Sequence, residues 1–79
     1  MDTTSAVRAM VQRSGMSARA VSQAAGRTPD YLGSILYRGS SPSLATAADL
    51  AAPCGYAVAL VPVADLPPSA LVIDPRPTA

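Results

Sequence analysis

The charged side chains of this chain of 79 residues are all arginine or aspartate. Because the sequence holds no histidine, lysine or glutamate, its serines lack the usual general bases that would activate them as nucleophiles. The single cysteine, Cys54, allows neither an internal disulfide nor a structural zinc site. The remaining chemistry is phosphate binding by arginine and hydrogen bonding by short polar side chains. We therefore expect a protein that is not an enzyme and that holds no metal or cofactor.

The arginines are concentrated in the first half of the chain. Residues 8–38 contain five arginines and one aspartate, a net charge of +4, whereas residues 39–79 contain one arginine and three aspartates, a net charge of −2. This asymmetry favours contact between the first half and nucleic-acid phosphates. On charge alone, a solvated surface explains the arginines equally well.

The elements that must position these side chains are predicted to be four short helices within residues 1–55. A first helix runs to about Ser14, where Gly15 follows as a stop signal, and helical spacing predicts a core-facing side formed by Val7, Met10 and Val11. Ser17 is the predicted N-cap of a second helix over about residues 18–25, whose predicted buried residues are Val21, Ala24 and Ala25. The candidate N-caps of the first helix are Thr3, Thr4 and Ser5.

The third helix has the clearest start signal, with a threonine cap, a proline at the first position and an aspartate in the first turn. Its predicted range is about 28–38, and its buried side is formed by Leu32, Ile35 and Leu36. Ser43 can cap a fourth helix, which Pro53 ends by Ala51 or Ala52.

The spacing of apolar residues changes after Gly55. Large and small side chains alternate from Tyr56 to Val61, which predicts a strand, and residues 71–73 predict a second one. The expected fold class is mainly α with a small C-terminal β element, an α+β fold. Residues 1–55 form a helix-turn-helix domain, 56–74 a β-hairpin and 75–79 a disordered tail.

Two stretches resemble the phage-repressor and Cro type of helix-turn-helix proteins. Residues 16–26, MSARAVSQAAG, are similar to the second helix and turn of that family, and residues 28–39, TPDYLGSILYRG, to its recognition helix. The resemblance covers roughly residues 4–56. It departs from the family at Ala18, where a glutamine is common, and at Pro53, which interrupts the fourth helix.

The resemblance implies a transcriptional repressor that binds a palindromic operator in double-stranded DNA as a homodimer. A cytoplasmic location follows from the lone cysteine and the polar N-terminus, and we expect no membrane association. The competing hypothesis is an antitoxin or another interaction module whose C-terminal strands bind a partner protein.

The outer side of the third helix is expected to enter the major groove. There Asp30 could accept from a cytosine amino group and Ser34 could bond to any base. Arg19, Arg27 and Arg38 suit phosphates. The predicted DNA-binding residues are Arg19, Arg27, Thr28, Pro29, Asp30, Tyr31, Gly33, Ser34, Tyr37 and Arg38.

Several of these residues also have a purely structural interpretation. Tyr31 could pack its ring on the second helix, and Asp30 could serve only as a charge at a helix N-terminus. Arg8 and Arg13 are expected to be solvated, and Cys54 to be a small buried side chain.

The predicted hairpin is expected to mediate dimerisation, because two strands alone are marginally stable and one recognition helix reads few base pairs. The dimerisation residues are Tyr56, Val58, Leu60, Leu71, Val72 and Ile73. The alternative is a hairpin that covers the helices of its own monomer.

Overall fold

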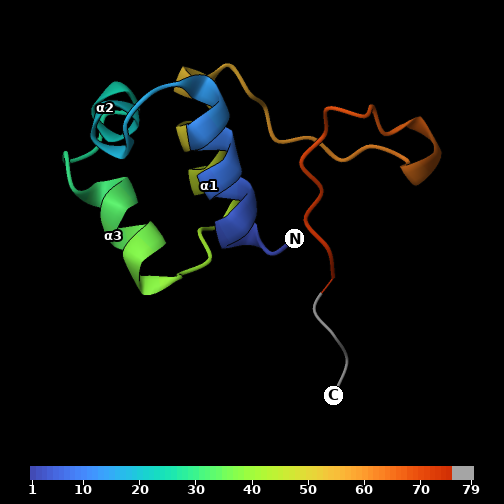
Figure 1. Cartoon of the computed structure of the whole chain (residues 1–79), viewed down its shortest axis with the longest axis horizontal. Helices are drawn as coiled ribbons and strands as arrows, with labels where there is room; N and C mark the ends of the chain where they lie inside the picture. The colour runs from blue at the N-terminus through green and yellow to red at the C-terminus, as the bar shows by residue number, and fades with distance from the viewer. Residues whose placement is uncertain (76–79) are drawn as a thin grey trace.

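Four α-helices followed by an irregular C-terminal segment make up the structure, a computed structural model in which residues 1–75 are described (Figure 1). Two 3-10 turns, η1 (Ala52–Cys54) and η2 (Val63–Asp65), follow the helices. The helices are α1 (Thr3–Ser14), α2 (Ala18–Ala24), α3 (Tyr31–Arg38) and α4 (Leu44–Ala51). The prediction of four helices in the first 55 residues is therefore confirmed, including the end of α4 just before Pro53.

Three of the four helices are capped by the side chain of their own N-cap residue. Ser17 and Ser43 accept hydrogen bonds from backbone N–H groups three residues ahead, as predicted for α2 and α4. The predicted cap of α1 was wrong, because the Asp2 carboxylate accepts from the Ser5 N–H at 2.8 Å. A carboxylate is favoured at this positive end of a helix. The hydrogen bonds from Ser5 hold the pKa of the Asp2 carboxyl below its usual value.

The third helix starts later than predicted. Residues 28–30 form a turn in which the Tyr31 N–H donates to the Thr28 carbonyl at 3.1 Å. The regular helix begins at Tyr31, and the Asp30 side chain forms no capping bond. Thr28 and Pro29 therefore lie in the connection between α2 and α3. The prediction of a threonine-capped start was wrong because the cap comes from another helix.

That cap is the side chain of Ser22 in α2, which is fully buried. Its hydroxyl donates to the Ala18 carbonyl at 2.7 Å and accepts from the Leu32 N–H at 3.0 Å. One hydroxyl thus satisfies a free N–H in the first turn of α3 and joins the two helices. The bond joins residues ten positions apart in the chain, so local sequence patterns did not predict it.

The helices enclose one small hydrophobic core. Leu32, Leu50 and Val21 are fully buried, each contributing about 1.5–3 kcal/mol by burial. The predicted buried sides of α1 and α3 are confirmed, with Leu36 only partly buried, whereas the prediction that Ala24 is buried was wrong. The core residues are Val7, Met10, Val11, Val21, Leu32, Ile35, Leu50, Ala51 and Cys54.

Two side chains of α1 hold the C-terminal end of α3. Arg8 donates to the Leu36 carbonyl at 3.2 Å, where a helix has carbonyl groups without internal partners. The buried Thr4 hydroxyl lies 3.0 Å from the Ser40 carbonyl oxygen and 3.3 Å from that of Gly39. α3 is therefore fixed from α2 at its start and from α1 at its end.

The predicted β-hairpin over 56–74 was wrong, because the described residues after Gly55 contain no strand and the fold is all-helical. We call residues 56–75 the C-terminal segment. It leaves the helices, turns at η2 and comes back towards α1 (Figure 1). Four residues of the segment cannot donate to a strand partner, because Pro62, Pro67, Pro68 and Pro75 lack an N–H.

The returning part of the segment is tied to the start of the chain. The Asp74 N–H donates to the Met1 carbonyl at 2.9 Å, and the Asp74 carboxylate pairs with the terminal ammonium group. Arg13 donates to the Ser69 carbonyl at 3.4 Å. Of the tail predicted over 75–79, all but Pro75 lies outside the described residues.

We predict that Ser22→Ala destabilises the protein by about 1–3 kcal/mol, because it leaves the buried Leu32 N–H without an acceptor. The measurement is urea unfolding followed by circular dichroism. Ser34→Ala is the matched control, since it makes the same change in helix propensity at an exposed position of α3. Equal midpoints for the two variants would contradict the proposed role of the Ser22 hydroxyl.

Candidate nucleic-acid interface

A shallow, open hollow lies between the start of α2 and the outer side of α3. Its volume is about 470 Å³, and it brings together six of the predicted DNA-binding residues. These six are Arg19, Pro29, Asp30, Gly33, Ser34 and Tyr37, and Ala18 completes the lining.

The groups around this hollow are free to meet a ligand. Within residues 1–75, the side chains of Asp30, Ser34 and Tyr37 form no hydrogen bond to the protein, and Tyr37 is 93% exposed. Leu32 and Ile35 point the opposite way, into the core. The outer side of α3 therefore offers a carboxylate, a hydroxyl and a phenol together.

Gly33 lines the hollow without adding a side chain to it. A Cβ built at this position would have no neighbouring heavy atom within 4 Å, so packing does not require the glycine. Its backbone φ is also in the ordinary range, unlike that of Gly26 in the turn before α3, where φ is +76°. The absence of a side chain at Gly33 instead lets another molecule come close to the helix.

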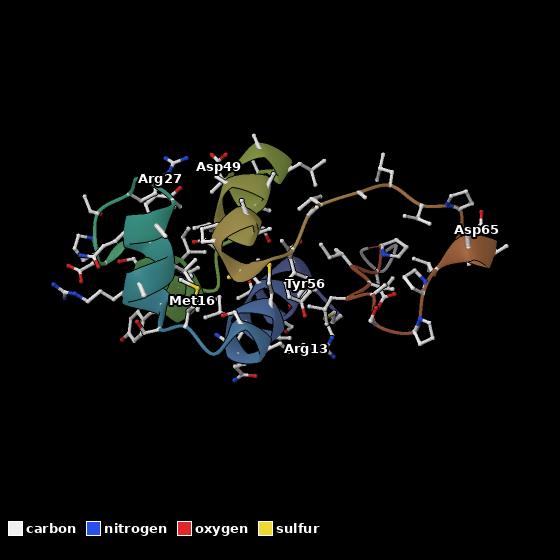
Figure 2. The ribbon with its side chains drawn as sticks, turned by 90° about the horizontal axis from the view of Figure 1, so that it is seen from above. Arg13, Met16, Arg27, Asp49, Tyr56 and Asp65 are labelled. Atoms are coloured by element: carbon white, nitrogen blue, oxygen red, sulfur yellow. The ribbon has the colours of Figure 1, made fainter. Side chains whose placement is uncertain are left out.

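Arg27 and Tyr31 do not line the hollow. An Arg27 guanidinium nitrogen lies 3.1 Å from an Asp49 carboxylate oxygen of α4, and the two side chains are neighbours in Figure 2. The guanidinium carbon is also 4.9 Å from the centre of the Tyr31 ring. Tyr31 is half-buried against the core, which agrees with the structural interpretation of this residue.

The remaining predicted contacts, Thr28 and Arg38, are exposed but lie outside the hollow lining. Arg8 and Arg13, expected to be only solvated, each bond to a backbone carbonyl while staying exposed. No local signal in the sequence could have shown this, because the acceptors lie 28 and 56 residues further along the chain.

The predicted dimerisation residues fall into two groups. Tyr56 and Leu71 are half-buried against the core, whereas the others are exposed: Val58, Leu60, Val72 and Ile73. They border an open groove of about 1150 Å³ between α1, α4 and the C-terminal segment. This groove, named the rear groove below, shares no lining residue with the hollow on α3.

Among residues 1–75, no group of three or more histidine, cysteine, aspartate or glutamate side chains could hold a metal ion. In the same range, no helix is both long and apolar enough to cross a membrane.

No protein-family model, curated protein or solved structure matches the chain.

We predict that the Arg27–Asp49 pair contributes only about 0.2–1 kcal/mol, because it is exposed to solvent. The exposed fractions of the two side chains are 37% and 56%. Urea unfolding of Arg27→Ala, Asp49→Ala and the double variant measures the coupling free energy. Residues in contact can reach coupling free energies above about 2 kcal/mol. Such a value for Arg27 and Asp49 would contradict the prediction and would show that the pair contributes substantially to the stability of the fold.

Proposed function

We propose that the protein binds double-stranded DNA in a sequence-specific manner through the outer side of α3 and regulates transcription as a repressor. The observation that carries the proposal is the hollow over α2 and α3, which unites Arg19, Asp30, Gly33 and Ser34 on one exposed surface. A cytoplasmic location is part of this proposal, and the unpaired Cys54 is compatible with it.

The shape and chemistry of α3 support an approach to the major groove. An α-helix with its side chains is about 10–12 Å wide, close to the width of that groove. Small side chains at Gly33 and Ser34 allow the helix to come near the base edges. Asp30 at the start of the helix could accept from a cytosine amino group, and Ser34 could donate to or accept from a base.

Charge supports the same orientation. Arg19 lies at the edge of the hollow and Arg38 at the end of α3, both exposed and without an acidic partner among residues 1–75. These two side chains suit phosphates on either side of a bound groove. Arg27 could join them by exchanging Asp49 for a phosphate, since the pair is exposed.

A protein-binding role for α3 has less support. Helices that dock on proteins present large apolar anchors, and on the outer side of α3 only Tyr37 is a large, exposed apolar residue. The antitoxin hypothesis instead concerns the C-terminal segment, and it is compatible with DNA binding by α3.

We predict that Arg19→Ala weakens binding to all duplexes and lowers the slope of log K against log salt concentration by about one unit. The measurement is fluorescence anisotropy with a duplex selected from a random library, at several salt concentrations. Arg13→Ala is the control, because it removes the same charge from α1, away from the hollow. A wild-type slope near zero would contradict phosphate contact.

We predict that Asp30→Ala or Ser34→Ala relaxes the preference at one or two base pairs by about 1–3 kcal/mol, while folding is retained. Repeating the selection from a random library with each variant gives the base preference at every position. Ser69→Ala, an exposed serine of the C-terminal segment, should select the same site as the wild type. If both α3 variants also select that site, the assigned reading surface is wrong.

A further inference from the structure

The most unusual surface of the molecule lies away from α3. Seven large apolar side chains are exposed in the C-terminal segment, among them Leu60 at 95% and Val63 at 85%. Soluble monomers rarely expose contiguous apolar surface of this kind, and such patches mark interaction sites. The seven are Val58, Leu60, Val61, Val63, Leu66, Val72 and Ile73.

The backbone of the same segment also lacks partners. Within residues 1–75, the N–H groups of residues 57–61 donate to no protein acceptor, although Tyr56 still bonds to the Ala51 carbonyl at 3.0 Å. The segment therefore offers both apolar side chains and free backbone groups to another molecule.

We propose that this surface is covered by a second copy of the chain, in a two-fold dimer that joins the C-terminal segments and rear grooves of the two copies. Each copy carries a protruding apolar segment with Leu60 and Val63 beside an apolar groove, so it offers both halves of a reciprocal contact. A two-fold interface requires such a self-complementary surface, since each side contacts the same patch of the other.

The size of the surface fits a dimer. Of the 26 residues that line the rear groove, five are buried within the chain and the other 21 are partly or fully exposed. Stable protein interfaces involve roughly 20–30 residues on each side. Its helical wall is also apolar in part: Ala6, Met10 and Ala47 line it from within the core, and Leu44 lines it as an exposed side chain.

Charge does not oppose the association. The only charged residue between Tyr56 and Ile73 is Asp65, at the tip of the segment (Figure 2). Asp65 does not line the groove. Of the two aspartates that do, Asp74 pairs with the terminal ammonium group and Asp2 caps α1. Two copies can therefore approach without a concentration of like charge.

The position of the surface suits the proposed function. The C-terminal segment and α3 lie at opposite ends of the molecule (Figure 1). A dimer joined at the segments leaves both recognition helices open to DNA. A palindromic operator has two half-sites and requires two copies of the chain, which such a dimer would supply. The association of the two copies does not itself depend on DNA binding.

The test is sedimentation equilibrium of the full chain without DNA. We expect a dimer at micromolar concentration, and we expect Leu60→Asp to raise the dissociation constant by roughly a hundredfold or more, because a side chain buried at the interface is replaced by a charge. Val63→Asp should act in the same direction. Unchanged far-ultraviolet circular dichroism checks folding, which should survive because both side chains are exposed in the single copy.

The matched control is Tyr37→Asp, an equally exposed apolar residue on α3, at 93% against 95% for Leu60. It should remain dimeric even if it no longer binds DNA, so that failure of the dimer and failure of DNA binding are told apart. If the wild-type chain is still monomeric at 100 times the micromolar concentration at which we expect the dimer, the proposal is overturned. A different protein would then be the partner that covers the C-terminal segment. A Leu60→Asp variant that dimerises normally would also overturn it.

Discussion

The hydrogen bonds of the Ser22 hydroxyl determine how the two helices beneath the candidate interface are arranged. α3 has only eight residues, and a helix of this length is unstable alone in water. Its first turn has free N–H groups, and no side chain of its own caps them. By accepting from the Leu32 N–H, Ser22 sets the start of α3 relative to α2. This start directs Leu32 into the core and leaves Gly33 and Ser34 on the outside.

The other end of α3 is held in a different manner, by α1. Arg8 bonds to the Leu36 carbonyl, and Thr4 bonds to the carbonyls that follow the helix. An arginine near a helix C-terminus is also favoured by the partial negative charge there. α1 thus contributes to the candidate interface without lining it. The outer side of α3 gains a fixed orientation from contacts on its inner side and at its two ends.

Local patterns predicted much of the helical part and little of what joins the helices. The spacing of Val7, Met10 and Val11, and the caps at Ser17 and Ser43, depend on near neighbours in the chain and were predicted correctly. The bonds of Ser22 and Arg8 cross between helices, so no local signal shows them. The alternation of large and small side chains after Gly55 predicted strands. A strand also needs backbone hydrogen-bond partners on a neighbouring strand, and residues 57–61 have none within residues 1–75. Six of the ten predicted DNA-binding residues line the hollow. Arg27 instead pairs with Asp49, and Tyr31 packs against the core.

The central claim is that the outer side of α3 contacts DNA bases, and amide chemical shifts test it most directly. A ¹⁵N-labelled chain would be titrated with a duplex selected from a random library and with a scrambled duplex of equal length. The account predicts that the amides of Arg19, Gly33 and Ser34 shift most, and more with the selected duplex. Those of residues 57–61, beside the rear groove, should change little. Shifts confined to the C-terminal segment, or the same shifts with both duplexes, would contradict it.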